Sequence, residues 1–198
     1  MYLSTLRLWN FRKYCAMADG KPGLEIHFQE SVNVLIGEND SGKTAIVDAI
    51  RYVLRTQSGE FIQFEDKDFY QEPDGNRKDE FKIECVFDGI NEQDAGLFWE
   101  WLSWNDDKTK YLLKVWLYAK RKDNIIMPTF SAGIEGQAER MDSEARELLK
   151  VVYFKPLRDA LTDMTHGYKS RLAQILGAHE LFKTEKDVHG NIIKHKLE

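Results

Sequence analysis

The sequence predicts an α/β fold organised around one strand, one loop and one helix. Residues 32–36 form a short apolar run rich in β-branched side chains, which is typical of a buried strand. A loop bounded by two glycines follows at residues 37–44. Beyond it, apolar residues recur at helical spacing, as one face of a helix requires. These helix positions are Ile46, Ala49, Ile50, Val53 and Leu54.

The loop at residues 37–44 matches the pattern G-x-x-x-x-G-K-[ST] of a phosphate-binding P-loop. Gly37 and Gly42 allow backbone N–H groups to turn inward around a phosphate, and the start of the helix adds its dipole. Lys43 is expected to bridge the β- and γ-phosphates, and the Thr44 hydroxyl to complete the shell of a Mg²⁺ ion. The alternative is a glycine turn that joins a core strand to a core helix and holds no ligand.

Lys43 and Thr44 are therefore the predicted catalytic residues, with Thr44 also the predicted metal ligand. The predicted nucleotide contacts in the loop are Gly37, Glu38, Asn39, Asp40, Ser41, Gly42, Lys43, Thr44 and Ala45.

The composition describes a globular chain without a membrane segment. The 198 residues fit one domain, or one domain with an insertion. The net charge is −5, from 28 basic and 33 acidic residues, so nucleic-acid binding has to depend on a local patch. No run approaches about 20 apolar residues and no secretory signal opens the chain, so a cytoplasmic location is expected.

The cysteines and histidines show no metal-binding spacing. Cys15 and Cys85 are far apart and are expected to be reduced thiols, with Cys85 in the core of a strand. The histidines are interpreted as scattered surface or core residues. They are His27, His166, His179, His189 and His195.

Alternating patterns predict further strands, and two polar residues predict helix starts. Strands are expected at residues 2–8 with Leu6 and Leu8 on one face, at 23–28, at 81–88, and as a short buried strand at 151–154. Asn91 is the predicted N-cap of a helix whose aromatic stripe packs in the core, and Asp142 that of a later helix.

Residues 110–120 form the most basic predicted strand. Interleaved Tyr111, Trp116 and Tyr118 suit a nucleic-acid face, but an edge strand protected by lysines is the favoured interpretation. The acidic loop at residues 61–70 is expected to be hydrated, with nucleotide contact as the alternative.

The chain resembles the ABC-type ATPases of the RecF, SMC and OLD (overcoming lysogenization defect) group in three features. These are Asn10-Phe11-Arg12, the alternating strand that follows, and a loop of the form G-x-N-x-x-G-K-T. The resemblance implies a P-loop NTPase: the N-terminal lobe of an ABC head, with a mixed sheet and an antiparallel β subregion. It implies ATP and Mg²⁺ as cofactors, a homodimer, and DNA as a partner of the full-length protein. It also places Arg12 over the nucleotide phosphates, whereas the alternative is a solvated charge at a strand end.

The tract Leu157-Arg158-Asp159-Ala160, followed by residues 170–176, looks most like the OLD family. Arg158 and Asp159 are second-tier candidates for nucleotide or interface contacts, with a local salt bridge as the alternative. By resemblance, the full-length protein couples ATP hydrolysis to DNA cleavage by a Toprim nuclease domain. No set of Toprim carboxylates occurs in these residues.

The resemblance covers only the first half of an ABC head. No apolar strand ending in Asp follows Ala160 to supply a second Mg²⁺ ligand, and no serine-glycine signature occurs. Residues 1–182 are interpreted as the ATPase segment and 183–198 as a polar tail, the start of an insertion, with Leu197 and Glu198 as a cloning scar. This chain is expected to bind nucleotide weakly and to hydrolyse it poorly.

Three other functions compete with the OLD assignment. One is a RecF- or SMC-like repair ATPase without a nuclease, and another is a nucleotide-sensing module that never hydrolyses ATP. A P-loop small-molecule kinase fits least well, because two strands precede the loop and no lid-like arginine pair is evident.

Overall fold

A computed structural model describes residues 1–105, 107–123, 125–135, 137–154, 185–186 and 192–194. The chain divides into two compact units, and each is described by itself. The first comprises residues 1–54 and 62–149, and the second residues 55–61 and 150–198.

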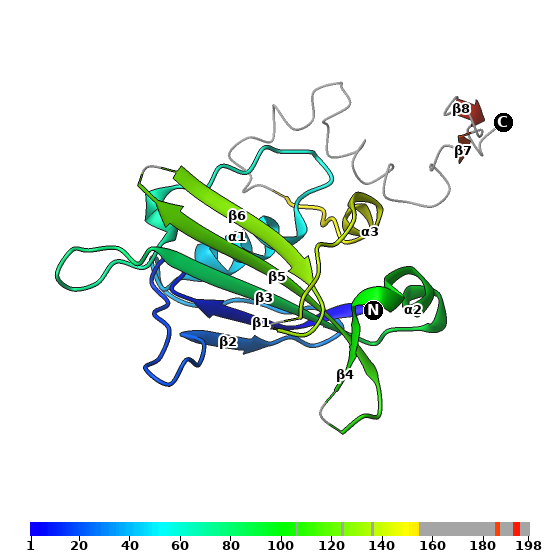
Figure 1. The fold of residues 1–198 in the computed structure, drawn as a ribbon, viewed down its shortest axis with the longest axis horizontal. Coiled ribbons are helices and arrows are strands. Elements are labelled where there is room, and N and C mark those ends of the chain that lie inside the picture. Colours follow the sequence, from blue (N-terminus) through cyan, green and yellow to red (C-terminus); the bar gives the residue numbers. More distant parts are fainter. Residues whose placement is uncertain (106, 124, 136, 155–184, 187–191, 195–198) are drawn as a thin grey trace. The chain divides into compact units, whose positions relative to one another are not determined.

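A six-stranded sheet dominates the first unit (Figure 1). Its strands run in the order β2-β1-β3-β5-β4, with β6 also paired to β5, and all these pairs are antiparallel. The bounds are β1 Tyr2–Trp9, β2 Leu24–His27, β3 Glu80–Asp88, β4 Leu102–Trp104, β5 Tyr111–Lys122 and β6 Ile125–Ala132. The predicted α/β class and antiparallel subregion are thus confirmed.

Helix α1 (Lys43–Leu54) covers one face of this sheet, behind β3 and β5 in Figure 1. The predicted alternation places Leu6 and Leu8 of β1 at 0% exposure. The same alternation buries the predicted face of β3: Phe81, Ile83, Cys85 and Phe87. Side chains two apart on a strand share a face, so these residues form one apolar layer against α1.

Two short helices begin at the predicted caps. The Asn91 side chain accepts a hydrogen bond from the Asp94 amide at 2.7 Å and starts α2 (Glu92–Phe98). The Asp142 side chain accepts one from the Ala145 amide at 2.7 Å and starts α3 (Ser143–Leu148). Each cap satisfies an amide that the first helical turn leaves without a partner.

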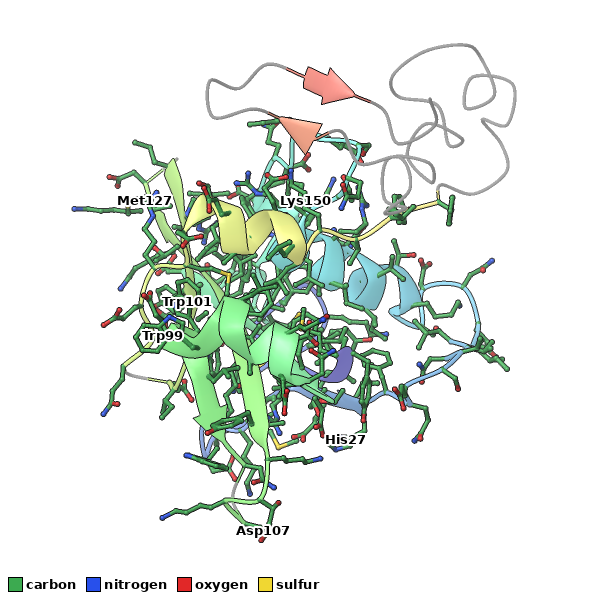
Figure 2. All side chains as sticks on the ribbon, turned by 90° about the vertical axis from the view of Figure 1, so that its right-hand side faces the viewer. His27, Trp99, Trp101, Asp107, Met127 and Lys150 are labelled. Carbon is green, nitrogen blue, oxygen red and sulfur yellow. The ribbon has the colours of Figure 1, made fainter. Side chains whose placement is uncertain are left out.

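The aromatic stripe after Asn91 is partly in the core, as predicted. Phe98 and Trp101 are buried, whereas Trp99, in the 3-10 turn η2 (Trp99–Trp101), is exposed. Figure 2 shows this corner of the molecule with Trp99 and Trp101 labelled. A second 3-10 turn, η1 (Asp66–Asp68), lies in the loop after α1.

In the second unit, the described residues form one parallel bridge and one strand pair. Thr56 pairs with Val151, and the Gln57 amide donates to the Val151 carbonyl at 3.0 Å. The strands β7 (Glu185–Lys186) and β8 (Ile192–Lys194) pair antiparallel. The predicted buried strand at residues 151–154 is wrong: only Val151 forms a bridge, and Phe154 is exposed.

The predicted buried strand at residues 32–36 is also wrong in this structure. The segment has no strand assignment, and Val32, Val34 and Ile36 are 84%, 72% and 90% exposed. Among the described residues, its backbone amides and carbonyls have no backbone partner. Apolar content alone does not bury a strand, because a central strand needs hydrogen-bonded neighbours on both sides.

The interpretation of residues 110–120 as a protected edge strand is wrong as well. β5 lies between β3 on one side and β4 and β6 on the other. Trp116 is buried, and its Nε1 donates to the Gly133 carbonyl at 2.9 Å. The lysines of β5 therefore flank a central strand, and the proposed nucleic-acid face stays a prediction.

The exposed segment yields a stability prediction. Val34→Ser and Ile36→Ser are expected to change the free energy of unfolding by less than about 0.5 kcal/mol, because neither side chain packs. Leu8→Ala, the buried control, should cost about 2–5 kcal/mol. Urea denaturation of the three variants measures both effects. A loss above about 1 kcal/mol in either serine variant would show that the segment is packed.

Two smaller expectations can be checked here. Cys85 is buried and Cys15 partly so, and both are free thiols, as predicted. Burial raises the pKa of the Cys85 thiol. In the described part of the chain, no helix combines the length and the apolar character that crossing a membrane requires.

Candidate nucleotide-binding site

The loop at residues 37–44 connects the exposed segment to the first turn of α1. Asp40 and Gly42 have positive φ angles of 62° and 104°, which curl the loop toward the helix start. Several amides here donate to no acceptor in the described part of the chain and are free to bind an anion. They belong to Asn39, Asp40, Lys43, Thr44 and Ala45.

The Lys43 ammonium lies on the loop itself. Its Nζ donates to the carbonyls of Gly37 and Glu38 at 2.7 and 2.6 Å and lies 3.3 Å from Ser41 Oγ. No described carboxylate pairs with it, so the charge is not neutralised. Backbone carbonyls are weaker partners for an ammonium than phosphate oxygens are, so an arriving phosphate can exchange with them.

The turn after β1 lies against the P-loop. Phe11 and Tyr14 pair through two backbone hydrogen bonds of 3.2 and 2.9 Å. A Cβ added to Gly42 would come within 2.2 Å of Tyr14 Oη and 3.0 Å of Lys13 Cδ. A larger residue at position 42 would displace the Tyr14 and Lys13 side chains, and the positive φ angle also favours glycine.

Arg12, in that turn, points into a buried ion network. Its Nε donates to Asp68 Oδ1 at 3.0 Å, its Nη1 to Asp48 Oδ2 at 2.8 Å, and its Nη2 to Tyr52 Oη at 3.3 Å. Asp68 is fully buried and also accepts from the Glu65 amide at 3.0 Å. The network ties the end of β1 to α1 and to η1.

The protonation states of the network follow from its surroundings. Burial opposes the charge on Arg12, but the hydrogen bonds to Asp48 and Asp68 outweigh it and raise the pKa of the guanidinium. Burial, followed by the nearby Asp68 carboxylate, raises the pKa of Tyr52 to about 12. The Tyr52 hydroxyl is therefore protonated at neutral pH and faces Asp68 as a donor.

A cavity of about 640 Å³ lies beside this turn. Four of the lining side chains are basic and one, Asp48, is acidic. The cavity is lined by Arg12, Lys13, Asp48, Lys67, Tyr70, Gln71 and Arg77. Lys13 also reaches the P-loop, because its Nζ donates to the Asp40 carbonyl at 3.1 Å. The cavity thus adjoins the loop and is electropositive.

The residues present fit a Mg²⁺ ion held mainly by phosphates and water. Thr44 is exposed in the first turn of α1, where its hydroxyl can serve as a ligand. The described residues contain no group of three or more histidine, cysteine or acidic side chains that could hold a metal. Thr44 as a Mg²⁺ ligand stays a prediction.

A family model described as an AAA ATPase domain matches residues 1–195. The chain belongs to this family. The DNA replication and repair protein RecF of Pediococcus pentosaceus is 45% identical over 58 residues, which are 29% of this chain and 14% of that protein. RecF of Symbiobacterium thermophilum is 43% identical over 58 residues, with the same shares. The match therefore spans a small part of these relatives' length.

A solved chain, from a study of ATP-driven dimerization and DNA-stimulated activation of SMC ATPases, has a similar fold. It superposes with a TM-score of 0.55 at 17% identity, covering 87% of this chain and 97% of that chain. At this identity the likeness shows the fold alone. The family match establishes an AAA ATPase domain, which resembles RecF over 58 residues and an SMC ATPase chain in fold.

The structure brings part of the predicted site of this AAA ATPase domain together. Residues 37–45 form one loop and helix start, and Arg12 lies near it but is engaged by carboxylates, so its phosphate contact stays a prediction. Arg158 and Asp159 lie outside the described residues.

The sequence analysis did not identify three side chains at or near the candidate site. Lys13 and Tyr14 lie against Gly42, and Asp68 is the buried partner of Arg12. An acid among aromatic residues was the available signal for Asp68, because a carboxylate in apolar surroundings needs a cation. Asp68 therefore has a structural role in the loop at residues 61–70, whereas the acids of this loop were expected to be only hydrated.

Proposed function

We propose that this chain binds ATP with Mg²⁺ at residues 37–45 and contributes to its hydrolysis. The observation that carries the proposal is the set of unpartnered amides at the start of α1, beside an uncompensated Lys43 and an electropositive cavity. Phosphoryl transfer needs positioning and charge neutralisation more than covalent chemistry, and these groups provide both.

The cavity supports a nucleotide rather than free phosphate. Phosphates in the loop would leave the remainder of the ligand free to extend past Lys13 into the cavity. Tyr70, Gln71 and Arg77 there offer a ring, an amide and a guanidinium to a nucleoside. Equilibrium titration with Mg·ATP, Mg·ADP and phosphate tests this: ATP and ADP should bind, and phosphate should bind much more weakly.

We propose further that the full-length protein is an OLD-family ATPase coupled to a DNA endonuclease. This is supported by the resemblance of the tract at residues 157–160, which lies outside the described residues. The second candidate is a repair ATPase without a nuclease, which the RecF identity over 58 residues favours. DNA nicking by the full-length protein with ATP and Mg²⁺ supports the first; ATP turnover without nicking supports the second.

Hydrolysis by this chain alone is expected to be poor, since its sequence has no apolar strand ending in Asp after Ala160 to supply a second Mg²⁺ ligand. ATP-dependent dimerization and DNA interaction are proposed for the full-length protein, in line with the SMC chain of similar fold. Light scattering with and without Mg·ATP tests the dimer. Binding of ATP without turnover in the full-length protein would instead indicate a nucleotide-sensing module.

A further inference from the structure

The two basic residues of the turn after β1 have different surroundings. Arg12 is in the left-handed region with φ of 51°, and its side chain enters the core. Lys13 is exposed, and its side chain runs over the P-loop. The backbone pairing of Phe11 with Tyr14 holds Arg12 and Lys13, the two central residues of the turn, in place. Their side chains therefore keep these different directions.

The Arg12 guanidinium is anchored at each of its three nitrogens, so it cannot move toward a ligand without breaking the buried network. Nε, Nη1 and Nη2 each have a partner among Asp68, Asp48 and Tyr52. Moving the guanidinium to a phosphate would leave the fully buried Asp68 without its cation. An uncompensated buried carboxylate is strongly unfavourable, so Arg12 is held in place.

Lys13 has the opposite properties. Its ammonium contacts the Asp40 carbonyl at 3.1 Å, its Cδ lies near Gly42, and no described carboxylate pairs with it. It also lines the cavity beside the loop. An ammonium on a flexible stem can leave one carbonyl for a phosphate oxygen at little cost.

We propose that Lys13 is a second cation that contacts the phosphate chain of the nucleotide, and that Arg12 is a positioning residue for the turn that carries it. This inference rests on the proposed ATP site. Lys43 approaches the phosphates from the loop, and Lys13 approaches them from the turn above Gly42. The family resemblance assigns the phosphate contact to Arg12, whereas this proposal assigns it to the next residue, Lys13.

The test compares Lys13→Ala with Lys21→Ala, a control in the same connection between β1 and β2 whose ammonium pairs with Asp19. Lys13→Ala should weaken binding of Mg·ATP and of inorganic tripolyphosphate about tenfold each, the loss of one charged contact. Its ATP affinity should also depend less on salt than that of the wild type. Lys13→Arg should retain most of the affinity, and Lys21→Ala should match the wild type.

An ATP affinity of Lys13→Ala within twofold of that of Lys21→Ala overturns the inference. Asp68→Asn provides an independent readout for Arg12, because it weakens the hold on the guanidinium. It should lower thermal stability without tightening ATP binding, whereas tighter binding would make Arg12 the phosphate cation. Failure of the ATP site itself would appear differently, as equal ATP binding by the wild type and Lys43→Ala.

Discussion

Lys43→Ala is expected to weaken ATP binding at least about 100-fold, the largest effect that any single loop residue should have. The substitution removes the ammonium that contacts the Gly37 and Glu38 carbonyls and would exchange them for phosphate oxygens. It also removes the contact with Ser41 Oγ, so the loop loses the group that draws its two ends together.

The fold should survive this change, because Lys43 contacts only loop atoms and makes no ion pair within the described residues. Titration calorimetry with Mg·ATP measures the affinity, and a thermal melt of the same sample measures the fold. Lys43→Arg is the informative partner variant, since it keeps the charge but changes its shape. Unchanged ATP affinity in Lys43→Ala would remove the main support for the nucleotide site.

The loop at residues 37–42 and the start of α1 were predictable because their signal is local. Gly42 shows this: one residue determines a φ angle, a close approach to Tyr14 and the start of α1. The caps at Asn91 and Asp142 are equally local, since each side chain bonds an amide three residues away. β1 and β3 were predictable because alternation already identifies their buried faces.

Strand neighbours were not predictable, because pairing joins residues that are distant in sequence. Residues 32–36 have the composition of a central strand, yet their backbone has no backbone partner in the described part of the chain. β5 has the lysines of an edge strand, yet it lies inside the sheet. A composition pattern reports what a segment can bury and leaves open which segment lies beside it.

The candidate site shows the same limit. Asn10-Phe11-Arg12 drew attention to Arg12, but its partner Asp68 lies 56 residues further along the chain. Only the fold shows that one guanidinium joins two carboxylates and a tyrosine, which leaves the neighbouring Lys13 facing the P-loop.

Asp68→Ala is expected to lower the free energy of unfolding by about 3–5 kcal/mol, the usual cost of removing one partner from a buried ion pair. Asp68 is 0% exposed and accepts from Arg12 and from the Glu65 amide. The variant therefore removes one of the two carboxylates that hold the Arg12 guanidinium and the acceptor of the Glu65 amide. Urea denaturation measures the loss.

Asp66→Ala is the matched control, because Asp66 lies in the same 3-10 turn but is exposed and pairs with Arg121 at 3.4 Å. An exposed pair of this kind contributes less than about 1 kcal/mol. The double variant Arg12→Gln/Asp68→Asn should lose less stability than the sum of its single variants, since each alone strands a buried group. Additive losses, or a cost for Asp68→Ala no greater than for Asp66→Ala, would mean that water reaches the network and that Arg12 is free to move.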